Sequence, residues 1–267
     1  MTTLICFALK EEAAPFRKIA RATAAPAQAG ISILLTGIGR QNAEKSVRDL
    51  LGSAPAPGAA VVASSTAKAN DAASFATREG ACAPQLVLTC GFAGGLNPDL
   101  KLGDVVFEIF PCSSRGNEAQ TKIGNRKSEI GNELEPPYVV CNEKLLAAGA
   151  KQARLFCADR VATTAAEKKK MRDETGADAV EMESAAIHAV CAEHGIACVT
   201  IRVISDTASE DLPLDFNELA KPDKSLDFGK LAWAIAKSPG KIPQLMQLQK
   251  KTKFAAERLA AVLSKIF

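Results

Sequence analysis

The sequence predicts an α/β fold in which buried strands alternate with helices. Short apolar runs rich in valine, isoleucine and leucine recur along the chain, mostly without the apolar–polar alternation of a half-exposed strand. Helical patterns fall between these runs, as they do in proteins with parallel sheets. The chain has 267 residues, of which 47% are hydrophobic and 24% charged, and this composition allows one full-sized core.

The predicted strands are six apolar runs, each short and bounded by glycine, charged or polar residues. They cover residues 4–9, 31–35, 86–90, 105–110, 179–182 and 198–204. Because most of them are apolar on both sides of the backbone, we expect helices to cover both faces of the sheet.

Helices are predicted from apolar residues at helical spacing and from capping residues. Thr164 and Glu167 form a capping box and Gly176 is a C-terminal cap, so a helix is expected between them. The other predicted helices cover residues 42–51, 184–194, 226–237 and 242–266.

The predicted organisation is a single domain over residues 1–267. Two stretches interrupt the alternation, at about 53–84 and about 113–137, and we expect them to be insertions or long surface loops. A helical extension is expected at about 212–267.

The C-terminal tail is basic and ends in an amphipathic pattern. Residues 237–267 contain seven Lys or Arg and one acid, so this tail has a charge of +6. Because the net charge of the chain is +3, the rest of the chain has a charge of −3. An apolar stripe is expected to pack on the body, in preference to the alternative of lying on an anionic membrane. The stripe is Leu259, Val262, Leu263 and Ile266, and the side chains expected largely in solvent are Lys250, Lys251, Lys253 and Lys265.

Composition argues against several functional classes. An acidic body with 5% aromatic residues does not fit a nucleic-acid binder. No apolar run reaches the length of a membrane span and the N-terminus does not resemble a signal peptide, so a cytoplasmic location is expected. The eight cysteines are scattered without ligand spacing, so we expect reduced thiols and no metal site.

A glycine-rich turn at residues 37–42 resembles part of a dinucleotide-binding fingerprint. Asn42 stands where the third glycine is needed, and residues 58–65 contain no acid to bind a ribose. A nicotinamide cofactor is therefore not expected, and no other cofactor is indicated.

Chemically active residues follow the predicted strands. The segment 179–206 is interpreted as a βαβ unit, whose parallel strands would bring Glu183 and Asp206 to one sheet edge. Ligands bind at this edge in α/β proteins. Each residue alone could be a cap, Glu183 for the following helix and Asp206 for the following turn, but their joint occurrence favours a site.

Five motifs occur together in the chain: FALKEE at 7–12, TGIG at 36–39, GFAGGL at 91–96 followed by LGD at 102–104, VEME at 180–183 and ISD at 204–206. In this order they resemble the nucleoside phosphorylase superfamily, and among its members the methylthioadenosine/S-adenosylhomocysteine nucleosidases. The tail, with residues 212–217 and 238–240, more resembles the hopanoid-associated branch of the superfamily.

The resemblance implies a three-layer α/β/α domain around a twisted mixed sheet, acting as a homodimer or higher homo-oligomer. It also implies cleavage of the bond between a purine and C1′ of ribose. Asp206 would be the general acid that protonates adenine at N7, oriented by Ser205, and Glu183 would hold the ribose hydroxyls with Met182 packed on the sugar. Glu12 would activate water, although the adjoining Glu11 is a competitor for that role.

The resemblance also implies substrate contacts from Phe92, Ala93 and Gly94, in the glycine-rich motif at 91–96. The family places an aromatic residue against adenine where this chain has Val161, and Phe92 is a substitute for it. These positions depart from the family pattern, which leaves the group at the ribose 5′ position open.

The choice of nucleophile is also open. Thr89 stands where related phosphorylases carry an arginine, which favours water over phosphate, but Gly39 and Arg40 form a possible anion site. We expect hydrolysis, with a phosphorylase or an adenosyl-hopane-type nucleosidase as alternatives. A non-catalytic nucleoside-binding protein is an alternative of another class, although pure binding would not need the acid.

Overall fold

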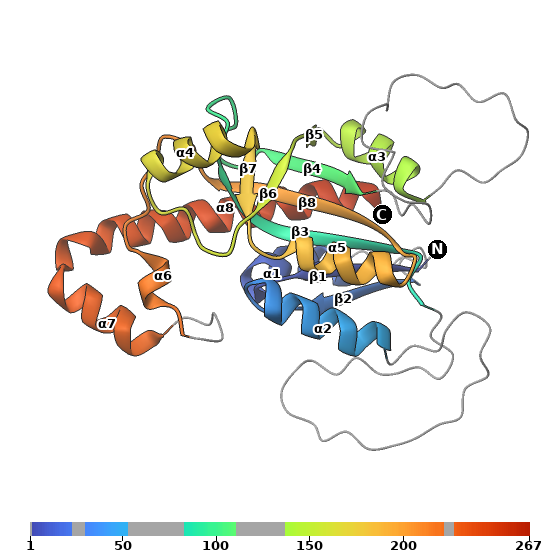
Figure 1. Ribbon diagram of the computed structural model, residues 1–267, viewed down its shortest axis with the longest axis horizontal. Helices are drawn as coiled ribbons and strands as arrows, with labels where there is room; N and C mark the ends of the chain where they lie inside the picture. Colours follow the sequence, from blue (N-terminus) through green and yellow to red (C-terminus); the bar gives the residue numbers. More distant parts are fainter. Residues whose placement is uncertain (1, 23–29, 53–82, 111–136, 222–226) are drawn as a thin grey trace, which may run out of the picture.

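Figure 1 shows a computed structural model of the chain, which describes residues 2–22, 30–52, 83–110, 137–221 and 227–267. Within these residues the strands are β1 (Thr3–Phe7), β2 (Ile31–Leu35), β3 (Leu86–Gly95), β4 (Val105–Phe110), β5 (Lys151–Gln152), β6 (Leu155–Cys157), β7 (Ala179–Glu181) and β8 (Ala197–Asp206). The helices are α1 (Lys10–Ala22), α2 (Arg40–Gly52), α3 (Pro137–Ala147), α4 (Ala165–Thr175), α5 (Ser184–Glu193), α6 (Phe216–Leu219), α7 (Phe228–Lys237) and α8 (Ile242–Ile266), with a 3₁₀ turn, η2 (Pro239–Lys241).

The strands form a mixed sheet in the order β2-β1-β3-β8-β4-β5. The first four of these strands run parallel to one another, and β4 runs antiparallel to β8. β7 pairs antiparallel with the last two residues of β3 and parallel with β6. The ten-residue strands β3 and β8 are therefore central, and they end side by side.

Helices cover both faces of the sheet, which gives the predicted three-layer α/β/α arrangement (Figure 1). In β1, Ile5 and Phe7 face a core shared with α1, α3 and α8. Leu4 and Cys6, on the opposite face of the same strand, pack with α2 and α5. Successive side chains of a strand point to opposite faces, so a strand buried on both is apolar throughout, as in the sequence.

All six predicted strands are present. β3 continues beyond its predicted end at residue 90 to Gly95, whereas the ends of the other strands shift little. The helix between Thr164 and Gly176 has the predicted caps. Gly176 adopts a left-handed conformation (φ 66°), which ends α4. The structure adds α1, α3, α6, β5 and β6 to the predicted elements, and α6 lies within the predicted helical extension. The two predicted insertions lie almost wholly outside the described residues.

The βαβ interpretation of residues 179–206 is wrong. β7 runs antiparallel to β3, whereas β8 runs parallel to it, so the two strands joined by α5 point in opposite directions on the two edges of β3. Hydrophobic periodicity predicts strands but carries no direction. β7 pairs with only two residues of β3, and β1 pairs with residues 86–90 on the same edge.

The predicted apolar stripe of α8 packs on the body, because Leu259, Val262, Leu263 and Ile266 are all buried. Lys250, Lys253 and Lys265 are exposed as expected, whereas Lys251 is half-buried in an ion pair with Glu210 at 2.7 Å. Figure 1 shows α7 and the first turns of α8 extending beyond the end of the sheet. In the described part of the chain, no helix is long and apolar enough to cross a membrane.

Candidate active site

The candidate site lies on β3 between the end of β1 and the end of β7. β1 pairs with residues 86–90 of β3 and β7 pairs with Gly94 and Gly95. Among the described strands, none pairs with residues 91–93 on this edge, so their backbone groups can bind side chains. The N–H of Phe92 donates to Oε1 of Glu12 at 2.9 Å.

Glu12 is buried in the first turn of α1, while its neighbour Glu11 is exposed. A second backbone group, the N–H of Leu9, donates to its Oε2 at 2.9 Å. Burial raises the pKa of Glu12 to about 7, against the lowering effect of the two N–H groups and of Arg202. A carboxylate with this pKa can take a proton near neutral pH, and of the two competing acids only Glu12 faces β3.

Arg202 lies on β8 directly opposite Gly91 of β3. Its buried guanidinium contacts Glu181 (Nη2 to Oε2, 2.5 Å) and Glu183 (Nη2 to Oε2, 3.5 Å). Burial opposes the charge, but the surrounding carboxylates raise the pKa of Arg202, which therefore stays a cation. We call Glu12, Glu181, Glu183 and Arg202 the carboxylate cluster.

Glu181 anchors this cluster. Its carboxylate accepts hydrogen bonds from the Ser184 hydroxyl at 2.5 Å and from the backbone N–H groups of Glu183 and Ser184. Burial acts to raise its pKa, but Arg202 and these donors together lower the pKa to about 2. Glu181 is therefore the permanent counterion of Arg202.

Glu183 is at the N-cap position of α5 but makes no capping hydrogen bond with its side chain. Its Oε1 instead accepts the N–H of Gly39 at 2.9 Å, and burial raises its pKa. The interpretation of Glu183 as a helix cap is wrong. Its carboxylate points from the end of β7 toward the turn before α2.

Asp206 ends β8 at a β-bulge. Ala93 pairs with Ile204 and Gly94 with Asp206, so Ser205 is the extra residue on β8. Bulges next to active sites re-aim side chains. The Ser205 hydroxyl donates to Oδ1 of Asp206 at 2.7 Å.

The other oxygen of Asp206 contacts a residue that the sequence does not single out. The Nζ of Lys168, on α4, lies 2.5 Å from Oδ2 of Asp206, and the Lys168 side chain is fully buried. In the turn after Asp206, the N–H of Thr207 donates to the Glu210 carboxylate. The Asp206 carboxylate thus contacts Ser205 and Lys168, and the residue that caps the following turn is Glu210 and not Asp206.

The remaining predicted contact residues surround this region unequally. Phe92 is half-buried against the core under α1 and α8, Ala93 is buried, and Met182 is half-buried beside Glu183. Val161 is held by Asn217 of α6, whose side chain accepts from its N–H at 2.9 Å and donates to its carbonyl at 3.0 Å. Asn217, in the C-terminal extension, is a further residue that the sequence does not reveal.

Both groups of the predicted anion site already have protein partners. The N–H of Gly39 donates to Glu183. Arg40 donates to the Cys157 carbonyl at 2.5 Å and pairs with Asp159 at 3.3 Å. An anion here would have to displace these contacts.

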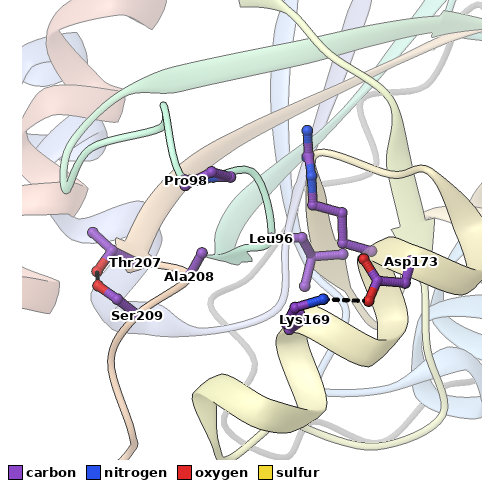
Figure 2. A pocket seen from close by; sticks show the side chains of 8 residues that line it. Leu96, Pro98, Lys169, Asp173, Thr207, Ala208 and Ser209 are labelled. Carbon is purple, nitrogen blue, oxygen red and sulfur yellow. Dashed lines mark hydrogen bonds and ion pairs between the residues drawn. The ribbon is translucent and has the colours of Figure 1, made fainter.

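A hollow of about 350 Å³ lies beside the segment that follows β8, at Thr207, Ala208 and Ser209 (Figure 2). Its lining residues are Leu96, Pro98, Lys169, Arg172, Asp173, Thr207, Ala208 and Ser209. Thr207 directly follows Asp206, but none of the predicted site residues lines the hollow. It is a neighbour of the candidate site and does not contain it.

Lys168 and Arg202 carry different signals in the sequence. Arg202 interrupts an apolar run, and a charge in a buried strand almost always has a partner, which identifies it in retrospect. Lys168 stands in a run of three lysines, which is typical of a solvated helix face.

The sequence pattern of the Phosphorylase superfamily matches residues 12–237, most of the chain. The chain belongs to this superfamily. The matched region contains all four residues of the carboxylate cluster as well as Asp206. The expected nucleoside phosphorylase-like fold and family membership are therefore confirmed.

Individual members of the superfamily resemble the chain more weakly. A 5′-methylthioadenosine/S-adenosylhomocysteine nucleosidase of Shewanella halifaxensis is 30% identical over 153 residues, which are 51% of this chain and 63% of that protein. An aminodeoxyfutalosine nucleosidase of Campylobacter jejuni is 29% identical over 152 residues, which are 50% of this chain and 61% of that protein. The match thus spans less than two thirds of the length of these curated relatives.

Solved structures resemble the whole chain at lower identity. A futalosine hydrolase of Helicobacter pylori superposes with a TM-score of 0.56 at 18% identity, covering 100% of this chain and 97% of that one. A Neisseria meningitidis 5′-methylthioadenosine/S-adenosylhomocysteine nucleosidase in complex with methylthio-immucillin-A gives 0.55 at 20% identity, covering 99% and 97%. At this identity the likeness shows the fold.

Proposed function

We propose that this chain hydrolyses the N-ribosidic bond of an adenine nucleoside and releases adenine. The observation that carries the proposal is the placement of two carboxyl groups on opposite edges of β3. Glu12 is held from the edge that β1 leaves free, through Phe92, and Asp206 pairs with Gly94 from the β8 edge. Two carboxyl groups on either side of a bond are the arrangement used in glycoside hydrolysis. The names of the curated relatives, both nucleosidases, support the same reaction.

In this mechanism Asp206 donates a proton to N7 of the departing adenine, with Ser205 orienting its carboxyl group. The sugar develops oxocarbenium character, and Glu183 holds its hydroxyl groups beside Met182. Glu12 takes the proton of the attacking water, a role that suits a pKa raised to about 7. The base and sugar would contact the end of β3, at Phe92, Ala93 and Gly94, and the loop of Val161.

Water is favoured over phosphate by the charges around Glu12. The buried carboxylate cluster contains three carboxyl groups and one guanidinium. A phosphate dianion placed there would be repelled in a poorly screened site, whereas a carboxylate assists the loss of a proton from water. Gly39 and Arg40, the donors that a phosphate would need, are occupied by Glu183, Cys157 and Asp159.

The test is adenine release from 5′-methylthioadenosine in phosphate-free buffer and again with added phosphate, with identification of the sugar. We expect the same rate in both buffers and free 5-methylthioribose as product. A phosphate requirement with a sugar 1-phosphate product would replace the proposal with phosphorolysis. Binding of the nucleoside without any adenine release would replace it with a non-catalytic binding protein.

Substrate, assembly and location are parts of the same proposal. The names of the relatives favour methylthioadenosine or S-adenosylhomocysteine as substrate, and adenosine derivatives with larger 5′ groups are the comparison set. We propose a homo-oligomer, to be measured by sedimentation. Six described cysteines are unpaired and mostly buried, which supports a reducing, cytoplasmic location.

A further inference from the structure

We infer that Lys168 positions Asp206 and passes it the proton that the departing base takes. This inference rests on the proposed function, because it assigns Asp206 the role of general acid. It adds a residue of α4 to a site otherwise built from strand ends and α1.

All three ammonium N–H groups of Lys168 have acceptors. Nζ lies 2.5 Å from Oδ2 of Asp206, 2.8 Å from the carbonyl oxygen of Thr207 and 2.9 Å from that of Glu210. A lysine ammonium has three donors and no acceptor, so its direction is fixed completely. One N–H is aimed at the carboxyl group, and the other two bind the chain that follows it.

The burial of Lys168 is exceptional on its helix. Its side chain is 0% exposed, whereas those of Lys169 and Lys170 are 76% and 75% exposed. Taking a charged group out of water is strongly unfavourable unless the group is paired and hydrogen-bonded. A neutral donor would be enough to hold the carbonyl groups of Thr207 and Glu210. We therefore assign the positive charge of Lys168 to its contact with Asp206.

The contacts of Asp206 show where its proton comes from. Oδ1 accepts from the Ser205 hydroxyl and Oδ2 from the Lys168 ammonium. Of these two groups, only one can supply a proton to Asp206. The ammonium can release a proton and become a neutral amine, whereas a serine hydroxyl would leave an alkoxide.

The step balances with water as the second substrate. The N–C1′ bond breaks with its electron pair on the base, N7 takes a proton from Asp206, and a proton of Lys168 replaces it. The water oxygen bonds to C1′ as its proton passes to Glu12. At the end Lys168 is a neutral amine and Glu12 a neutral acid. Glu12 loses its proton to water, and Lys168, which is fully buried, regains its proton through the slightly exposed Asp206.

The experiment is a double-mutant cycle on 5′-methylthioadenosine hydrolysis. Lys168→Met is expected to lower kcat on the order of 10²-fold, which is the rate loss expected when general acid catalysis is removed. The change in KM should be smaller. In the Asp206→Asn background the same substitution should cost less than about threefold, because the two residues act in one step. In the Glu12→Gln background it should again cost on the order of 10²-fold.

Two further variants separate proton transfer from structure. Lys168→Arg keeps a cation but does not release a proton, so its kcat should stay low while its fold and KM are retained. This variant decides the question if Lys168→Met does not fold. Lys170→Met, on the exposed face of α4, is the matched control and should turn over like wild type.

Several outcomes would overturn the inference. Wild-type kcat in Lys168→Met or Lys168→Arg would remove the proton transfer. A full further loss in the Asp206→Asn background would make Lys168 a structural residue. If the wild-type protein released no adenine, the proposed function would fail first, which is a different result from an active wild type with an equally active Lys168→Met.

Discussion

Gly91 and Arg202 face each other across β3 and β8, and the missing side chain of Gly91 makes room for the Arg202 guanidinium. A Cβ at Gly91 would lie 2.6 Å from Nη1 of Arg202 and 2.8 Å from Oε1 of Glu12. Glycine inside a strand often marks such a close approach. The site therefore depends on this position as much as on its charged groups.

Gly91→Ala should fold but lose most activity, because a methyl group separates Arg202 from Glu12. Both side-chain ends are buried and hydrogen-bonded, so they cannot give way without leaving their partners. We expect kcat/KM to fall on the order of 10²-fold or more, as misplaced catalytic groups do. Gly52→Ala is the matched control, since a Cβ there meets nothing within 4 Å. Equal activity of the two variants would contradict the prediction.

The pH profile should report Glu12. As the proposed base it must be ionised, and burial raises its pKa to about 7. The kcat/KM value should therefore fall about tenfold for each pH unit below about 7, since this parameter reports the free enzyme. Glu11→Gln, beside it on the exposed face, should keep this acid limb. A profile that is flat from pH 5 to 8 would remove Glu12 as base.

The sequence locates both carboxyl groups of the proposed mechanism because both follow apolar runs that become strands. It does not locate the cations that engage them. Lys168 lies among lysines that do face solvent, and only tertiary packing separates it from Lys169 and Lys170. The opposite directions of β7 and β8 are likewise a property of pairing, and periodicity within a segment does not contain it.

One strand was predicted too short because of its glycines. Residues 86–90 are apolar and predict a strand, whereas Gly91, Gly94 and Gly95 resemble a turn. In the structure β3 continues to Gly95, because pairing with β8 outweighs the low strand propensity of glycine. This continuation builds the candidate site, since it brings the Phe92 N–H to Glu12 and Gly94 opposite Asp206.

Glu12 should also make stability depend on pH. Its pKa is about 7 in the folded protein, whereas an unperturbed glutamate has a pKa of 4.5. Between these values the folded protein binds more protons than the unfolded chain, so the free energy of unfolding falls as pH rises. The loss, complete above about pH 7, is on the order of 3 kcal/mol.

Glu12→Gln removes this dependence. Its amide has one oxygen for the two N–H groups of Leu9 and Phe92, which costs about 1–3 kcal/mol at every pH. The informative quantity is the difference in unfolding free energy between variant and wild type, measured by denaturant at pH 4 and pH 8. Relative to pH 4, this difference should change by about 3 kcal/mol in favour of the variant at pH 8, because only the wild type loses stability as pH rises. A constant difference would show that Glu12 titrates normally.

Asn217 should tie substrate affinity to the C-terminal extension. It makes two hydrogen bonds, at 2.9 and 3.0 Å, with the backbone of Val161, in the loop proposed to lie against the base. Asn217→Ala frees that loop, so substrate binding becomes weaker by the free energy needed to order it. Two hydrogen bonds of about 1 kcal/mol each correspond to a KM increase of roughly tenfold or more, with a smaller change in kcat because Asp206 and Glu12 are untouched. Glu218→Ala, exposed on the same short helix, is the control and should leave KM unchanged. A fall in kcat at constant KM would instead place Asn217 among the groups that act on the reacting bond.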